Sequence, residues 1–150
     1  MNDETGSFSE NIQMYLVTAL RLREGGEPGA LPKLAHELDI STASVNEMCR
    51  KLEEQGLMEY RPYAGVSLTP EGERLAKLIL RKHRLWEVFL VDTLNYDYNT
   101  AHETACRLEH ATPPHLADRL ESHLGTPLVN PQGEPIPYVG EDVDLPQEVS

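Results

Sequence analysis

The apolar residues between Ser9 and Arg23 recur every three or four positions, which predicts an amphipathic first helix. These apolar residues are Ile12, Tyr15, Leu16, Ala19, Leu20 and Leu22. The pattern ends at Glu24-Gly25-Gly26, and a loop of Gly and Pro residues is expected over residues 25–29.

Two shorter helices separated by a tight turn are predicted next. The apolar residues of the first are Leu31, Leu34, Ala35 and Leu38. Asp39-Ile40-Ser41 interrupts that repeat, and Ser41 and Thr42 are both good N-caps for a following helix. The apolar residues of that helix are Val45, Met48, Cys49 and Leu52, and Gly56 ends it. The pattern is typical of a helix-turn-helix.

A strand, a turn and a second strand are predicted over residues 57–60, 61–65 and 66–69. A hairpin placed directly after a helix-turn-helix forms the wing of a winged helix. The predicted recognition helix would fit the major groove of DNA while the hairpin reaches the neighbouring backbone.

The second half of the chain is predicted to be helical. Thr69 is a plausible N-cap and Pro70 occupies the first helical position of a helix that runs to about Thr93. Further helices are expected over residues 99–111 and from Pro113-Pro114 to Gly125. The last of these carries one apolar face, made of Leu116, Leu120 and Leu124. From residue 126 onward, prolines recur among acidic residues, which predicts an extended tail that packs partly on the helices.

Composition limits the possible classes of protein. The net charge of −12 argues against a protein that coats nucleic acid by charge alone, but it allows a local basic face. No apolar run reaches the ~20 residues of a membrane span, and the start of the chain lacks the pattern of a secretory signal. We therefore expect a cytoplasmic protein with no membrane partner. Cys49 and Cys106 are far apart in helical segments, so a disulfide scaffold is not expected.

The predicted recognition helix begins with small residues that allow close approach to base edges, and Asn46 and Glu47 lie one turn further in. Basic residues near it would contact phosphates. The predicted DNA-binding residues are Lys33, Ser41, Thr42, Ala43, Ser44, Asn46, Glu47, Arg50, Lys51 and Arg61. The alternative is a protein–protein contact, which such folds also make. Because basic residues are few, specific binding to double-stranded DNA is expected to require a dimer.

The segment from His102 to His110 lies on a predicted helix and carries four candidate metal ligands. His102, Cys106, Glu109 and His110 are spaced so that their side chains are expected on one helical face. Thiolate, carboxylate and neutral imidazole bind first-row divalent metals, and this mixture disfavours calcium and magnesium.

A second pair, His83 and Glu87, is spaced by four residues on the preceding helix and is able to meet His102 in another site. Simpler interpretations exist for these residues. A His–Glu pair on a helix is commonly a solvated face, and Cys106 has the alternative role of a small buried apolar residue. Cys49 is interpreted as a core residue, because it lies at an apolar position of the recognition helix.

The order of several motifs resembles the DtxR/IdeR-type metal-dependent repressors, a family that includes manganese-sensing relatives. The motifs are Met14-Tyr15-Leu16, Ser44-Val45-Asn46-Glu47-Met48, the segment Tyr63–Thr69, Arg81-Lys82-His83-Arg84-Leu85, the segment Ala105–His110, and Gly133-Glu134-Pro135-Ile136-Pro137. The resemblance covers the chain to about Tyr138.

The resemblance implies two metal sites. The primary site would use Met14 with Cys106, Glu109 and His110, and an ancillary site would use His83, Glu87 and His102. Three-domain members add ligands from a C-terminal SH3-like domain, which is not expected in this two-domain form, so the ancillary site is expected to be the weaker one. Manganese-type relatives place carboxylates where Met14, Val17 and Cys106 stand here. The set therefore resembles the iron type, with Fe²⁺ the first choice, Mn²⁺ the second, and Co²⁺, Ni²⁺ or Zn²⁺ able to substitute.

The sequence thus predicts a mainly α protein, with an N-terminal winged helix-turn-helix and small β-hairpin wing followed by a helical dimerisation domain. The expected division is residues 1–73 for DNA binding, 74–126 for metal binding and dimerisation, and 127–150 for a proline-rich acidic tail. The expected function is a homodimeric transcriptional repressor, not an enzyme, with a divalent metal as corepressor. The alternatives are a metal-independent winged-helix regulator and a metalloenzyme.

Overall fold

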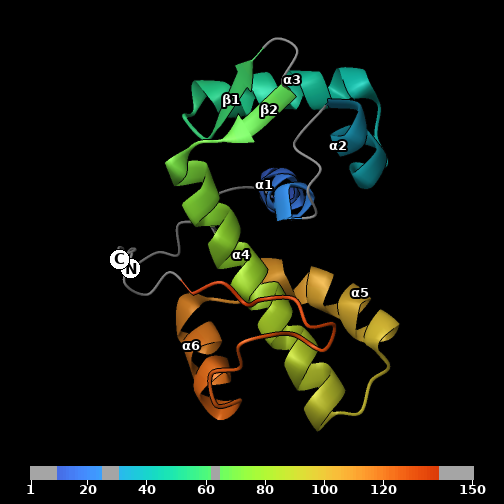
Figure 1. Cartoon of the computed structure of the whole chain (residues 1–150), viewed down its shortest axis with the longest axis vertical. Coiled ribbons are helices and arrows are strands. Elements are labelled where there is room, and N and C mark those ends of the chain that lie inside the picture. Colours follow the sequence, from blue (N-terminus) through green and yellow to red (C-terminus); the bar gives the residue numbers. More distant parts are fainter. Residues whose placement is uncertain (1–9, 25–30, 62–64, 139–150) are drawn as a thin grey trace. The chain divides into compact units, whose positions relative to one another are not determined.

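A computed structural model describes residues 10–24, 31–61 and 65–138 (Figure 1). The chain divides into two compact units, and the division falls inside one long helix, between Ala76 and Lys77. The loop predicted at residues 25–29, the tip of the predicted wing and the end of the tail lie outside the described residues. The predicted boundary at residue 73 stays a prediction.

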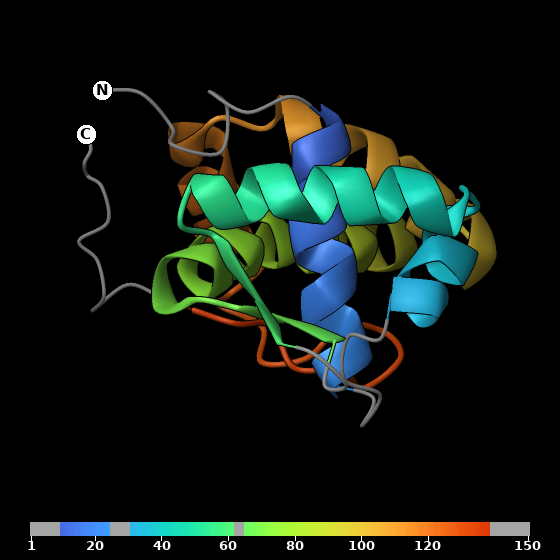
Figure 2. The ribbon, with the colours of Figure 1, turned by 90° about the horizontal axis from the view of Figure 1, so that it is seen from above.

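The first unit begins with α1 (Glu10–Glu24), α2 (Leu31–Leu38) and α3 (Thr42–Glu54). Figure 2 shows α3 lying across α1. The apolar residues of α2 and α3 place one side of each helix inward, whereas α1 is buried on all sides from Tyr15 to Leu20. The fully buried leucines and valines of these helices include Leu16, Leu34, Val45 and Leu52.

The predicted helix-turn-helix is confirmed, including its cap. Ser41 has extended backbone angles, and its Oγ accepts a hydrogen bond from the backbone N–H of Ser44 at 3.1 Å. Asp39, in the turn before it, has a φ of 57°, a left-handed conformation that Asp tolerates better than most residues.

The predicted wing is also present. Strand β1 (Met58–Arg61) pairs antiparallel with β2 (Gly65–Leu68), and Met58 is opposite Leu68. Met58 and Val66 are buried on one face of the hairpin, whereas Glu59 and Ser67, a pair on the other face, are exposed, so the hairpin packs one face on the unit and leaves the other open. Both strands differ by one residue from the predicted bounds.

Helix α4 (Pro70–Val88) crosses the division between the units, and a π-helix (Phe89–Thr93) continues it. The predicted N-cap is confirmed, since the Oγ of Thr69 accepts a hydrogen bond from the N–H of Gly72 at 3.0 Å. The prediction of one regular helix to Thr93 is wrong in its last turn, where the wider π-helical turn leads into Asn95 with a φ of 62°.

The second unit is completed by α5 (Tyr98–Leu108), a 3₁₀-helix (Glu109–Ala111) and α6 (Pro114–His123). Its core joins α4 and α6 to the segment after them, through Leu85, Val88, Leu120 and Ile136. The expectation that this segment packs on the helices is confirmed for the residues up to Tyr138. On the predicted apolar face of α6, Leu120 is buried and Leu124 packs against the core, whereas Leu116 is 38% exposed.

Among the residues described, no helix has both the length and the apolar character needed to cross a membrane.

Candidate metal centre and nucleic-acid interface

Helix α4 places His83 and Glu87 one turn apart on its buried side, with exposed fractions of 1% and 0%. The Nε2 of His83 lies 2.7 Å from Oε2 of Glu87. Two polar side chains buried this completely require partners, because an unpaired charge in the core is strongly unfavourable. The partners come from α5 and the turn that follows it.

Helix α5 brings His102 and Cys106 to the same place, again one turn apart. The Nδ1 of His102 lies 2.7 Å from Oε2 of Glu87 and 3.2 Å from Nε2 of His83. The Sγ of Cys106 is 3.9 Å from Nε2 of His102. One ligand atom each from His83, His102 and Cys106 lie within 4.8 Å of one another, which is a spacing compatible with one metal ion.

Glu109 joins the group from the 3₁₀-helix. Its Oε1 lies 2.7 Å from Nδ1 of His83, and its Oε2 lies 3.2 Å from Nε2 of His110. The prediction of one helix over residues 99–111 is wrong at its end, because α5 stops at Leu108 and Glu109 and His110 belong to a 3₁₀-helix. The tighter 3₁₀ turn directs Glu109 at His83.

His83 therefore connects the two sets of residues that the sequence assigned to separate sites. We call the six residues together the α4–α5 cluster; they are His83, Glu87, His102, Cys106, Glu109 and His110. All six belong to the second unit. Met14, the remaining predicted ligand, is half-buried in the first unit, and its role as a ligand stays a prediction.

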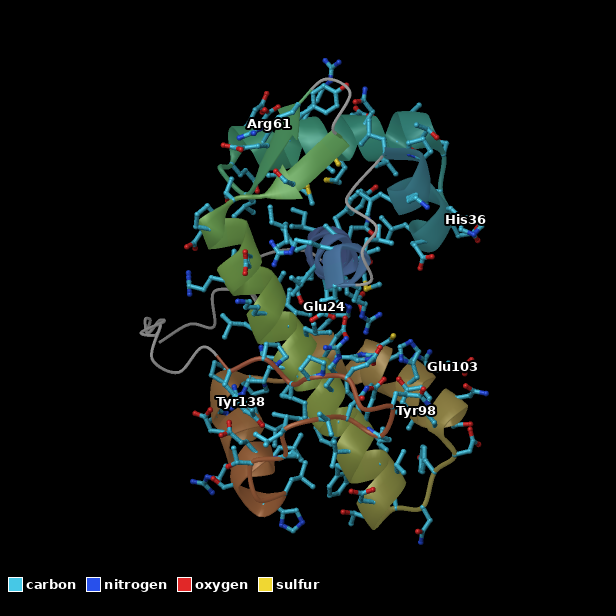
Figure 3. The ribbon with its side chains drawn as sticks, in the orientation of Figure 1. Glu24, His36, Arg61, Tyr98, Glu103 and Tyr138 are labelled. Carbon is cyan, nitrogen blue, oxygen red and sulfur yellow. The ribbon has the colours of Figure 1, made fainter. Side chains whose placement is uncertain are left out.

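Two neighbours of the cluster were missed by the sequence analysis. The hydroxyl of Tyr98, which Figure 3 labels near the start of α5, donates to Oε2 of Glu87 at 2.9 Å. The Nδ2 of buried Asn130 donates to Oε1 of Glu87 at 2.7 Å. Periodicity gave no signal for Asn130, because it reaches Glu87 from an irregular segment 43 residues further along the chain.

The pKa values of three groups in the cluster are shifted toward their charged forms. Burial opposes the ionisation of Glu87, but hydrogen bonds from His102 and His83 outweigh it and hold its pKa below the ordinary value. Hydrogen bonds to Cys106 and Glu87 raise the pKa of His102 to about 9. Burial also opposes ionisation of Cys106, yet hydrogen bonds with His102 and His83 lower its pKa to about 6. These pKa shifts favour the carboxylate of Glu87 and the thiolate of Cys106 at neutral pH.

The donor set fits a divalent first-row metal. Imidazole, thiolate and carboxylate converge, and they are the ligands such ions prefer. Both ring nitrogens of His83 face carboxylate oxygens at 2.7 Å, so this imidazole lies between the carboxylates of Glu87 and Glu109.

The predicted DNA-binding residues lie mostly on the surface of the first unit. Those that are exposed are Lys33, Ser41, Thr42, Ala43, Ser44, Glu47, Arg50, Lys51 and Arg61. Asn46 is half-buried. The Nη2 of Arg61 lies 3.1 Å from Oε1 of Glu59, a pairing between two exposed side chains that contributes little to stability.

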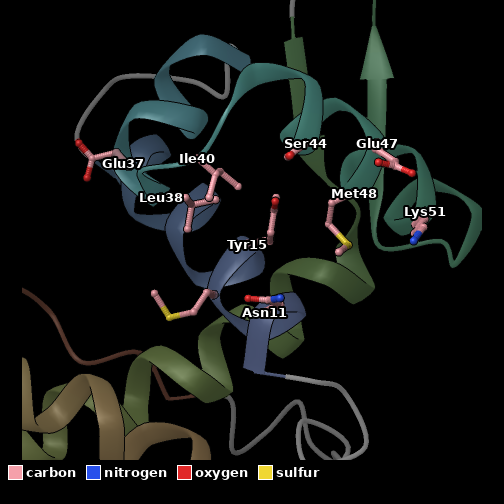
Figure 4. A pocket seen from close by; sticks show the side chains of 10 residues that line it. Asn11, Tyr15, Glu37, Leu38, Ile40, Ser44, Glu47, Met48 and Lys51 are labelled. Carbon is pink, nitrogen blue, oxygen red and sulfur yellow. The ribbon is translucent and has the colours of Figure 1, made fainter.

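One side of α3 opens onto a hollow of about 470 Å³, shown in Figure 4. Ser44, Glu47, Met48 and Lys51 of α3 line it, with further residues of α1 and of the segment around α2. Cys49 does not line the hollow. It is 3% exposed, and burial raises its pKa to about 11, so its interpretation as a core residue is confirmed.

Comparison with known proteins agrees with this arrangement. The family model of the iron-dependent repressor N-terminal DNA-binding domain matches residues 7–66. The model of the iron-dependent repressor metal-binding and dimerisation domain matches residues 69–138. The chain belongs to the iron-dependent repressor family, so the resemblance identified from the motifs is confirmed. The family is one of transcriptional repressors and not of enzymes.

Individual relatives match this chain at 35–40% identity. The diphtheria toxin repressor of Corynebacterium glutamicum is 35% identical over 88% of this chain, and the match spans 58% of that protein. An HTH-type transcriptional regulator of Methanocaldococcus jannaschii is 40% identical over 76% of this chain and 92% of its own length. The solved structure of the manganese regulator SloR superposes with a TM-score of 0.77 at 37% identity, covering 89% of this chain and 62% of SloR.

Proposed function

We propose that this protein is a DNA-binding transcriptional repressor that requires a divalent transition metal as corepressor. The observation that carries the proposal is the α4–α5 cluster, in which one buried imidazole and two buried carboxylates meet a thiol on the same chain as a winged helix. The membership of the chain in the iron-dependent repressor family supports the same conclusion.

The residues that would hold metal fall into two sets. Cys106, Glu109 and His110, with Met14, form the proposed primary set. His83, Glu87 and His102 form the proposed ancillary set. The hydrogen bond between His83 and Glu109 links the two sets, so a ligand exchange in one is expected to affect the other. Hydrogen bonds that neighbouring side chains make to metal ligands orient those ligands and tune their basicity.

Fe²⁺ is the proposed corepressor and Mn²⁺ the second choice, with Co²⁺, Ni²⁺ and Zn²⁺ as substitutes. The thiolate of Cys106 favours Fe²⁺ over Mn²⁺, because sulfur is a soft ligand. The names of the relatives include both iron-dependent repressors and a manganese regulator. Availability in the cell is therefore expected to decide which of the two occupies the protein.

Separate groups of residues are proposed to contact DNA bases, DNA phosphates and the metal. The small residues at the start of α3 would approach base edges, while Lys33, Arg50, Lys51 and Arg61 would contact phosphates. A bound divalent cation would supply positive charge that the carboxylates and thiolate of the cluster require. Residues 74–126 are proposed to form the homodimer, which would place two copies of α3 about one DNA turn, roughly 34 Å, apart.

The test is the affinity for operator DNA, selected from genomic fragments under anaerobic, reducing conditions. We expect tight binding with Fe²⁺ or Mn²⁺ and a large loss of affinity with a chelator. Cys106→Ala is expected to remove the activation by metal while the circular dichroism spectrum stays unchanged. Equal affinity with and without chelator would support the metal-independent regulator instead.

A further inference from the structure

Glu47 is the one residue of the predicted DNA-binding set whose charge opposes DNA binding. It lies two residues after buried Val45 and two before buried Cys49. At 3.6 residues per turn, its side chain projects about 200° around the helix axis from that of Val45. Glu47 is exposed, so it stands on the outer face of α3, one turn in from the capped start of the helix.

No partner within the described part of the chain neutralises this carboxylate. Lys51 follows it by four residues, a spacing that favours ion pairs on helices, yet neither side chain makes an ion pair or hydrogen bond among the described residues. Both line the hollow beside α3 (Figure 4). The carboxylate oxygens therefore remain available as hydrogen-bond acceptors.

The neighbouring hydroxyl is oriented as a donor. Ser44 lies three residues before Glu47 and lines the same hollow. The hydroxyl of Ser41 donates to Oγ of Ser44 at 3.0 Å, so the proton of Ser44 is left to donate elsewhere. This edge of α3 thus offers one hydroxyl donor beside one acceptor that carries a negative charge.

We propose that Glu47 determines base specificity by accepting a hydrogen bond from the exocyclic amino group of a cytosine in the major groove. A carboxylate near phosphates is repelled unless it meets a donor, and only cytosine and adenine present amino donors in that groove. Adenine places the acceptor N7 beside its amino group, which would face the carboxylate unfavourably. Cytosine presents a donor alone, and its paired guanine presents acceptors that suit the hydroxyl of Ser44. The inference rests on the proposed function.

The experiment is selection from a randomised duplex DNA library by the full Mn²⁺-loaded chain and two variants. The variant E47Q removes the charge of Glu47. The variant E54Q is the matched control, because Glu54 is an exposed glutamate two turns further along the same face. Wild type and E54Q are expected to enrich the same motif. E47Q is expected to lose one cytosine preference and to accept adenine there, since Gln pairs with adenine.

Replacing that cytosine pair in the enriched duplex is expected to weaken wild-type binding roughly 5- to 150-fold, and E47Q binding far less. If E47Q and E54Q show the same base preferences at every position, the role of Glu47 is overturned while metal-dependent repression stands. If wild type enriches no motif with metal present, the proposed function fails, and the role of Glu47 fails with it.

Discussion

Cys49 and Cys106 are the same residue type in opposite surroundings. Cys49 is packed in the first unit with its pKa raised to about 11 by burial. Cys106 is half-buried, and hydrogen bonds with His102 and His83 overcome its burial and lower its pKa to about 6. Since the thiolate is both the nucleophile and the metal ligand, only Cys106 is prepared for metal binding at neutral pH.

This contrast predicts selective alkylation of the metal-free protein. Because its folded-state pKa is lowered, Cys106 should gain reactivity with iodoacetamide as pH rises through about 6. Cys49 should react only as the protein unfolds. Mass spectrometry of Cys49→Ser and Cys106→Ser separates the two thiols, and added Mn²⁺ should slow the labelling of Cys106. Equal labelling of both thiols at pH 7 would contradict the assigned environments.

At the scale of elements, local sequence signals predicted the helices well where caps and periodicity agreed. The caps Ser41 and Thr69 are both observed. The π-helix at Phe89–Thr93 and the 3₁₀-helix at Glu109–Ala111 were not predicted. Apolar periodicity does not distinguish these turns from an α-helix, because they change the hydrogen-bond pattern over a few residues only.

The start of α4 is held against the wing by a close approach that requires glycine. A Cβ on Gly72 would lie 2.0 Å from the backbone oxygen of Leu57. The Oγ of Thr69 also donates to the backbone oxygen of Gly56 at 2.7 Å. The first turn of the helix is therefore fixed to the residues just before β1.

Gly72→Ala is predicted to destabilise the protein by about 3 kcal/mol, because the backbone of Leu57 must move to admit a methyl group. In the solvent-exposed interior of a helix, a change from Gly to Ala would stabilise the folded protein by about 1 kcal/mol. Urea unfolding measures the difference. The exposed change Glu54→Ala serves as control and should stay within about 0.5 kcal/mol. A more stable Gly72→Ala variant would show that the contact is absent.

At the scale of the whole molecule, the sequence predicted the ligand pairs but not how they meet. Spacing identified His83 with Glu87 and Cys106 with His110, since each pair lies within one or two helical turns. The contact between His83 and Glu109 depends on how α5 packs on α4, which no local pattern encodes. The same holds for Asn130, whose segment returns to Glu87 after α6.

Asn130→Ala is predicted to lower the affinity of the second unit for Mn²⁺ by about 10-fold or more, because Glu87 loses the donor that orients its Oε1. Calorimetric titration measures the effect. Glu134→Gln is the control, since Glu134 accepts a hydrogen bond from Asn130 but makes none with Glu87, and both residues are in the described part of the chain. Unchanged Mn²⁺ affinity in a folded Asn130→Ala variant would show that Glu87 needs no such support.

The proposal as a whole requires that metal binding and DNA binding be coupled. Thermodynamic linkage makes this coupling reciprocal, so DNA must raise the affinity for metal by the factor with which metal raises the affinity for DNA. The decisive measurement is the affinity for Mn²⁺ with and without saturating operator duplex. We predict an increase of about 5- to 150-fold with the duplex, the usual range of such coupling. The same Mn²⁺ affinity in both samples would contradict a metal corepressor.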